Sequence, residues 1–442
     1  MLSLPGPGHR TCDGVTRRDV LRAGTLALGG LSLADFLRLD SRAAERGESL
    51  PKTAVIQIFC GGGPSHLDMY DLKPNAPAEI RGEFREIGTR VPGVRISEHL
   101  PLQAAVMDRF AVVRSVAHGT SAHGIASQLI LTGRQPPRVT DDNIYPSCGS
   151  VVAKMRCPNP PGLPAYVAVP RRTSFGASAY LGGAYNPFTP EEDPNQKNFH
   201  VRNLRLAGDM TLDRLGSRGE LLAQFDRLRR DIDLAGDMLG IDTYSRSAME
   251  MVTSEQAGRA FDIESEDPRL REKYGRTQIG QNCLLARRLV EAGVTYVTCL
   301  SGGGWDTHRD NFAELKNVTL PRYDRAIAAL VSDIYERGLD RHVLVMAFGE
   351  FGRTPRINKD AGRDHWPGAM SMLLAGGGLK VGRMVGETDS VGAFPISKPY
   401  TPGCVMATMY RVMGIDPGHD FYDQNNRPMP ILPEGETIPE LI

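Results

Sequence analysis

Short apolar runs alternate with longer amphipathic stretches along most of the chain. Residues 53–60 form a nearly continuous apolar run, which is typical of a strand in a parallel sheet covered on both faces. The pattern predicts further strands at 110–115, 165–169, 294–300, 343–348 and 370–375. Because strands that alternate with helices usually form a parallel sheet, we expect an α/β fold with a mainly parallel central sheet.

Amphipathic segments separate these runs. Residues 320–337 carry apolar side chains at helical spacing on one face, and this spacing predicts a helix that covers the sheet. We expect further helices at 100–109, 122–131, 146–155, 278–292 and 402–413.

The character of the chain changes between residues 171 and 266. Pro, Asn and Gly are frequent up to residue 203, and charged helix-like segments follow, the longest at 214–239. No clear linker brackets this stretch. We therefore interpret 171–266 as an inserted cap and not as an independent domain.

Composition and charge narrow the class of protein. The 442 residues, of which 41% are hydrophobic, suffice for one large α/β domain with insertions or for two domains. Lys and Arg together number 52, as do Asp and Glu. No basic field favours a nucleic-acid partner.

Residues 1–45 resemble an export signal. Arg17 and Arg18 form a twin-arginine pattern ahead of a weakly apolar run at 23–34. Twelve residues are too few to cross a bilayer as a helix, so the segment predicts export without a stable membrane anchor. We expect a periplasmic or extracellular protein that uses the twin-arginine export machinery. An ordinary surface helix that contains Arg-Arg is the alternative.

Polar side chains that can bind a metal follow several predicted strands. Asp306 and His308 lie on a Gly-rich turn after residues 294–300, and an Asp-x-His pair suits Zn, Mn or a similar divalent metal. The same arrangement recurs at other strand ends, which offer His66, Asp68, His118, Thr120, Ser121, His123, Glu350, Arg353, Asp364 and His365. Since the carboxyl ends of parallel strands share one edge of a sheet, we expect these residues to meet.

The set predicts a hydrolytic centre with one or two metals, which would polarise an ester and activate a nucleophile. Arg353 could bind phosphate or sulfate oxygens with its planar fork. Structural roles compete with these assignments. Asp68 could cap a turn, His66 could be a hydrogen-bonded loop histidine, Glu350 and Arg353 could form an ion pair, and Asp364 could orient His365.

Several motifs in order resemble one exported bacterial family, the domain of unknown function 1501 family, a relative of the sulfatases and alkaline phosphatases. The motifs are the twin-arginine start, Gly62–Asp68, Leu131–Arg134, Trp305–His308, Gly349–Pro355 and Gly362–Trp366. The resemblance covers residues 52–442. It implies an alkaline-phosphatase-like three-layer sandwich with an inserted cap and with metals at the strand ends.

The resemblance also implies particular ligands for a divalent metal (Zn, Mn or Ca). Asp306 and His308 look like the superfamily's metal pair, Glu350 is similar to a ligand, and His365 looks like the final metal histidine. Asp364 adjoins His365 as a further candidate. After the first strand, Asp68 or His66 would replace the metal Asp of the relatives.

The nucleophile departs from the sulfatase pattern. A sulfatase carries a Cys-x-Pro-Ser-Arg or Ser-x-Pro-Ser-Arg motif shortly before Thr-Gly-Arg, whereas here His123 occupies that position. This argues against a formylglycine sulfatase. Thr120, Ser121, Ser65 or a metal-bound hydroxide could attack, and His123 could be a ligand or a general base.

We therefore expect an exported metal-dependent hydrolase that acts on a phosphate or sulfate ester of a small molecule or a carbohydrate. The alternative is a non-catalytic exported protein that uses the same metal-stabilised scaffold to bind a glycan.

Overall fold

The computed structural model describes residues 53–156, 159, 162–201, 250–251 and 253–442. They belong to one unit, Thr53–Ile442. The predicted export signal at 1–45 and the centre of the predicted cap, including the helix expected at 214–239, lie outside the described residues. No helix in the described part is both long and apolar enough to cross a bilayer.

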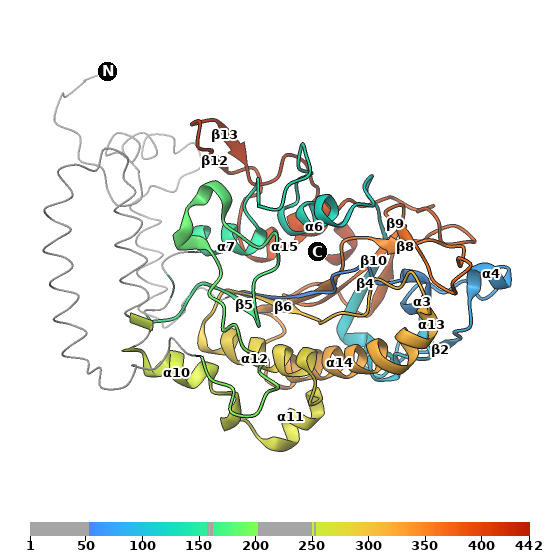
Figure 1. Cartoon of the computed structure of the whole chain (residues 1–442), viewed down its shortest axis with the longest axis horizontal. Coiled ribbons are helices and arrows are strands. Elements are labelled where there is room, and N and C mark those ends of the chain that lie inside the picture. The colour runs from blue at the N-terminus through green and yellow to red at the C-terminus, as the bar shows by residue number, and fades with distance from the viewer. Residues whose placement is uncertain (1–52, 157–158, 160–161, 202–249, 252) are drawn as a thin grey trace, which may run out of the picture. The chain divides into compact units, whose positions relative to one another are not determined.

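A seven-stranded sheet forms the centre of the fold (Figure 1). Its strands, in spatial order, are β11 (Arg383–Val385), β4 (Phe110–Val116), β10 (Met370–Gly376), β7 (Val343–Phe348), β1 (Ala54–Phe59), β6 (Tyr296–Leu300) and β5 (Tyr166–Val169). Only β10 runs antiparallel to its neighbours among the strands of this sheet. The predicted α/β class with a mainly parallel sheet is confirmed.

Helices cover both faces of the sheet and make three layers (Figure 1). One face packs against α12 (Gln278–Ala292) and α14 (Leu320–Glu336), and the other against α6 (His123–Thr132), α7 (Cys148–Met155) and α15 (Pro402–Val412). Alternate residues of β1 serve the two faces, since Ile56 and Ile58 belong to one core cluster and Val55 to the other. This explains why the strand is apolar throughout, because both of its faces are buried.

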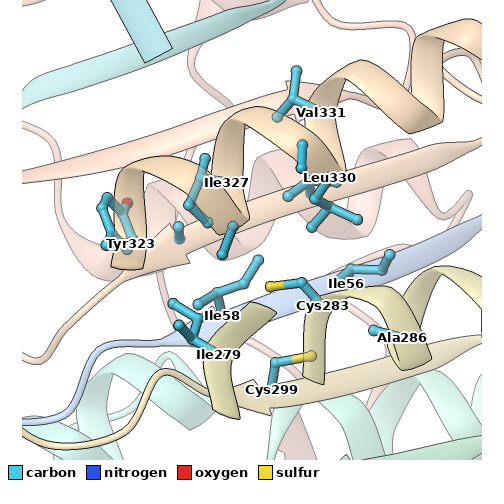
Figure 2. Close-up of a cluster of buried hydrophobic side chains, with 14 of the residues drawn as sticks. Ile56, Ile58, Ile279, Cys283, Ala286, Cys299, Tyr323, Ile327, Leu330 and Val331 are labelled. Atoms are coloured by element: carbon cyan, nitrogen blue, oxygen red, sulfur yellow. The ribbon is translucent and has the colours of Figure 1, made fainter. Parts of the chain in front are cut away.

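Figure 2 shows the larger of these two cores between β1, α12 and α14. Ile327 and Leu330 of α14 face Ile56 and Ile58 of β1, and all four are fully buried. Burial of each such side chain contributes about 1.5–3 kcal/mol. The predicted apolar face of residues 320–337 is therefore the face that holds α14 on the sheet.

Some predicted boundaries differ from the structure. The helix expected at 100–109 is two short pieces, α5 (Pro101–Ala104) and a 3-10 turn at Met107–Arg109. Pro146 precedes α7, because Ser147 is the N-cap and accepts a hydrogen bond from the Ser150 amide.

Shorter elements complete the described part. They are β2 (Glu86–Gly88), β3 (Arg95–Ser97), β8 (Gly352–Arg353), β9 (His365–Trp366), β12 (Asp420–Tyr422), β13 (Pro428–Pro430), α3 (His66–Met69), α4 (Ala78–Arg81), α10 (Glu255–Phe261), α11 (Pro268–Tyr274), α13 (Asn311–Glu314), a π-helical turn at Leu315–Thr319 and 3-10 turns at Ala179–Leu181, Gly183–Tyr185, Ile263–Ser265 and Pro439–Leu441.

Candidate metal centre

Loops from three strands meet at one edge of the sheet. Asp306 and His308 follow β6, and His123 begins α6 after β4. His365 lies on β9 and precedes β10. Because β10 is antiparallel, its amino end lies at the edge where the parallel strands have their carboxyl ends. That reversal places His365 beside residues that follow the other strands.

Three imidazole nitrogens surround the carboxylate of Asp306. Oδ1 lies 3.1 Å from Nε2 of His308 and 3.1 Å from Nε2 of His365, and Oδ2 lies 3.3 Å from Nε2 of His123. The two Nε2 atoms of His308 and His365 are 2.9 Å apart. Single ligand atoms of His123, Asp306 and His365 all lie within 4.8 Å of one another. We call Asp306, His123, His308 and His365 the metal centre, as a candidate site for a metal.

The other nitrogen of each imidazole faces an acceptor. Nδ1 of His308 donates to Asp364 Oδ1 at 2.6 Å, and Nδ1 of His123 donates to Glu350 Oε1 at 2.6 Å. Nδ1 of His365 donates to the carbonyl of Ser121 at 2.9 Å. Ionised carboxylates and carbonyls only accept, so these partners assign the proton of each neutral ring to Nδ1. Metal-binding histidines are commonly held in this way.

This arrangement suits a bound cation. With protons on Nδ1, the Nε2 lone pairs of the neutral histidines point toward the carboxylate of Asp306. These electron-rich groups repel one another at such short distances. A divalent metal would relieve that repulsion. Metal–ligand bonds of about 2.0–2.1 Å place tetrahedral ligands about 3.3 Å apart, close to the 3.1–3.3 Å contacts between Asp306 and the three Nε2 atoms. The ligand atoms that all lie within 4.8 Å of one another are those of His123, Asp306 and His365, and His308 joins them through its contacts with Asp306 and His365. The donor set therefore fits a divalent metal that accepts nitrogen and oxygen ligands.

The charges of the centre respond to the same contacts. Partial burial raises the pKa of Asp306, but the hydrogen bond from Arg353, with the contact to His365 and the charge of Arg353, outweighs it and holds the pKa well below its usual value. The hydrogen bond to Glu350 raises the pKa of His123, whereas burial lowers that of His365. The hydrogen bond from His308 lowers the pKa of Asp364. Asp306 is thus an anion over the physiological range.

The centre is open to solvent on one side. The side chains of His123, His308 and Asp306 are 40%, 41% and 47% exposed. Beneath them lies the fully buried ring of Phe351, whose centroid is 4.4 Å from that of His365. A ligand can therefore reach the centre from one face while an apolar floor closes the other.

Glu350 and Asp364 lie one step outside the centre. Glu350 is buried and accepts the Gly62 amide at 2.9 and 3.0 Å in addition to the His123 ring. Asp364 orients His308, not His365 as the sequence suggested as an alternative. Neither carboxylate is among the atoms that converge on Asp306, so the structure gives both an orienting position.

The contacts of His66 and Asp68 are with residues outside the centre. Asp68 is fully buried, accepts two hydrogen bonds from Arg363 at 2.9 and 3.1 Å, and also accepts from Ser65 and Asn311. His66 is buried, and its Nε2 contacts the Gly392 carbonyl at 2.8 Å. Burial lowers the pKa of His66. The contacts of both side chains are therefore those of structural residues.

Arg353 is also fully buried, which bears on its expected role with an anion. Its guanidinium donates to the carbonyls of Gly62, Gly63, Trp305 and Arg363 and, at 2.6 Å, to Asp306 Oδ1. The fork is thus engaged by the protein itself. Its contacts fix the Asp306 carboxylate in place.

The candidate nucleophiles separate into two groups. Ser65 is buried and donates to Asp68 Oδ2 at 2.5 Å, so its hydroxyl is committed. Thr120 and Ser121 lie on the loop between β4 and α6, and Ser121 is exposed two residues before His123. Of the candidate nucleophiles, Thr120 and Ser121 are thus the ones that lie within three residues of His123.

Sequence reasoning missed two residues that support the centre. Asn358 donates from Nδ2 to the His308 carbonyl at 2.9 Å and to Asp364 Oδ1 at 3.3 Å. His118, noted only as a strand-end residue, donates from Nε2 to the Glu350 carbonyl at 2.7 Å. Asn358 carries no motif signal, but the position of His118 just after β4 could have identified it.

Fold and site together define a three-layer α/β protein with an open cluster of three histidines and one carboxylate at one edge of its sheet. Residues 52–442 match the model of a family described as protein of unknown function (DUF1501), and the chain belongs to this family. The family resemblance predicted from the motifs is confirmed. No curated protein matches the chain.

Solved structures with a similar arrangement include sulfatases and alkaline phosphatases. A Bacteroides thetaiotaomicron protein from work on glycosaminoglycan metabolism is 11% identical, with a TM-score of 0.37 over 82% of this chain and 73% of its own. A sulfatase from Pseudoalteromonas sp. is 12% identical, with a TM-score of 0.33 over 86% and 70%. TAB5 alkaline phosphatase with Mg bound is 9% identical, with a TM-score of 0.36 over 83% and 99%. The fold described above rests on the chain's own sheet topology.

Proposed function

We propose that this protein is an exported metal-dependent hydrolase of a phosphate or sulfate ester. The observation that carries the proposal is the convergence of three histidine Nε2 atoms on Asp306, with each Nδ1 held by a carboxylate or a carbonyl. A divalent metal bound by these residues would act as a Lewis acid on an ester oxygen. Zn, Mn and Ca are the metals to test.

The chain's own residues would prepare the site for this chemistry. Arg353 keeps Asp306 ionised and fixed, because it donates to Oδ1 from a fully buried position. Glu350 and Asp364 orient His123 and His308. We assign His123 two alternative roles, ligand or general base, because it has the longest contact with Asp306 and a raised pKa.

The nucleophile in this proposal is Thr120 or Ser121. They lie three and two residues before His123, on a loop where Ser121 is exposed and Thr120 half-buried, and the Ser121 carbonyl accepts a hydrogen bond from His365. The single variants Thr120→Ala and Ser121→Ala would show which of the two hydroxyls the reaction needs.

The test is a panel of aryl phosphates, phosphodiesters and aryl sulfates, assayed with the purified protein after addition of Zn, Mn or Ca. We expect turnover of one ester class with at least one metal. His365→Ala and Asp306→Asn should each reduce it by at least 100-fold without unfolding the chain. His419→Ala, at an exposed histidine outside the centre, is the matched control and should keep full activity.

If metal binds and every ester stays intact, the hydrolase proposal fails. The alternative of a metal-stabilised glycan-binding protein then stands, and binding to a glycan array would test it.

We also propose that residues 1–45 direct twin-arginine export, on the pattern of Arg17 and Arg18 before the short apolar run. Replacement of both arginines by lysine should leave the protein in the cytoplasm of a bacterial host, whereas the unchanged chain should appear in the periplasm or the medium. Cell fractionation measures this. Equal export of both proteins would exclude this route.

A further inference from the structure

A cavity of about 420 Å³ lies at the carboxyl ends of β1, β5 and β6. Its lining includes Gly61, Arg171, Arg172, Thr173, Gln278 and Gly303. None of these residues was a candidate in the sequence, where Arg171 only marked the start of the predicted cap. None of the four residues of the metal centre lines the cavity either, so the cavity needs its own explanation.

Among the described residues, the lining of the cavity carries positive charge and no negative charge. Arg171 and Arg172 are both exposed, and neither forms an ion pair or a side-chain hydrogen bond with any residue that the structure describes. No described residue in the lining is acidic. By contrast, the buried Arg363 is paired with Asp68. Two free guanidinium groups in one cavity favour an anionic ligand, because their planar forks match sulfate, phosphate and carboxylate.

Two further features of the lining point in the same direction. Gln278 is the first residue of α12, a helix of 15 residues, and the amino end of a helix carries partial positive charge and free amide donors. Thr173 is 8% exposed and its hydroxyl has no hydrogen-bond partner in the described structure. A buried hydroxyl without a partner is uncommon, and it adds an unused donor to the lining.

The cavity is close to the metal centre. Gly303 precedes Asp306 by three residues, which span at most about 11 Å even when fully extended. On the other side, Gly61 adjoins Gly62, and a Cβ atom at Gly62 would lie 2.8 Å from the backbone nitrogen of Asp306. One small molecule can therefore reach both places.

We propose that this cavity binds a second anionic group of the substrate while the ester lies at the metal centre. The substrate class is then a small molecule or sugar that carries a sulfate, phosphate or carboxylate in addition to the ester. This inference rests on the proposed function for its link to the reaction. The anion site itself depends only on Arg171, Arg172 and their surroundings.

The test measures binding directly, so that it does not depend on turnover. Calorimetric titrations would use glucose 6-sulfate, glucuronate and neutral glucose. The proteins are the unchanged chain, the double variant Arg171→Ser/Arg172→Ser and the metal-centre variant Asp306→Asn/His365→Ala. A control variant, Arg411→Ser/Arg427→Ser, removes two exposed arginines that do not line the cavity.

We expect the unchanged chain and the metal-centre variant to bind at least one charged sugar and not glucose. The double variant at 171 and 172 should bind it at least tenfold more weakly, with its circular dichroism spectrum unchanged, and the control should bind normally. The sugar that binds more tightly identifies the anionic group. Absence of saturable binding to the unchanged chain, or equal affinity of the 171/172 variant, overturns the proposal. If these affinities behave as expected but no ester is hydrolysed, the anion site stands and the proposed function fails.

Discussion

At the scale of single residues, the metal centre contains residues that face one point, and other residues around it fix their orientation. Asp306 and three histidines face one point, while Glu350, Asp364 and Arg353 fix their orientation. Loss of such an outer contact commonly lowers metal affinity by about 10–100-fold. The candidate residues of the sequence therefore occupy three kinds of position in the structure: facing the common point, supporting those that face it, and making structural contacts elsewhere.

The role of Glu350 can be tested with Glu350→Gln. In the unchanged protein the Gly62 amide donates to both carboxylate oxygens of Glu350. Glutamine keeps one acceptor oxygen but replaces the other by an amide donor, which faces the Gly62 amide. We expect a roughly 10–100-fold loss of metal affinity, measured by competition with a coloured chelator. Glu436→Gln, at an exposed position, is the control. Unchanged affinity in Glu350→Gln would show that His123 needs no orienting partner.

Asp68 should behave as a structural residue. Its ion pair with Arg363 has 0% exposure on both sides, and loss of one partner leaves a buried charge uncompensated at a cost of about 3–5 kcal/mol. We expect Asp68→Asn to lower the free energy of unfolding by about 3 kcal/mol in a urea titration, with normal metal content in the folded fraction. Loss of metal with unchanged stability would instead make Asp68 a ligand.

At the scale of elements, the short helix α5 depends on a contact from α14. Asp324 of α14 accepts the backbone amides of Leu102 and Gln103 at 2.9 and 2.8 Å. These amides belong to the first turn of α5 and have no partner within the helix. The sequence could not indicate this contact, because more than 200 residues separate the two elements.

The same carboxylate makes stability depend on pH. Burial raises the pKa of Asp324 to about 6, against the opposing effect of the two amides. Between pH 4 and pH 6 the folded chain then binds more protons than the unfolded chain, so this group's contribution to stability falls as pH rises. Asp324→Asn removes the effect. Unfolding in chelator across pH 4–7 should show the wild type losing on the order of 2–3 kcal/mol relative to the variant. A difference that is constant with pH would exclude this titration.

At the scale of the whole molecule, the metal centre joins loops that follow β4 and β6 to β9, which precedes β10. A metal that binds only the folded chain stabilises it in proportion to RT ln(1 + [L]/Kd), which is about 2.7 kcal/mol at 100 times Kd. We therefore expect a chelator to lower the Tm of the unchanged protein by several degrees. Asp306→Asn should start from the lower Tm and show no further shift. Equal shifts in both proteins would place the metal elsewhere.

Periodicity sufficed for most of the fold. The predicted helix at 278–292 has the bounds of α12, and the strand at 343–348 has those of β7. The helix is long and the strand is strongly apolar, so the pattern of neighbouring residues is enough to predict each of them. The two-residue strands β8 and β9 are too short to carry such a pattern, although they pair with each other across a short stretch of the chain.

The sequence by itself determined the α/β class, the family and the chemical types of the site residues, because apolar periodicity and local motifs are properties of neighbouring residues. Only the tertiary structure decided which candidates converge. Asp68, Arg353 and Asp306 all follow buried strands, yet Asp68 pairs with Arg363 in the interior and Arg353 donates to Asp306. The direction of β10 was equally hidden, and it brings His365 to the edge of the sheet. The physical reason is that convergence depends on strand order and direction, which are set by packing between residues far apart in the chain.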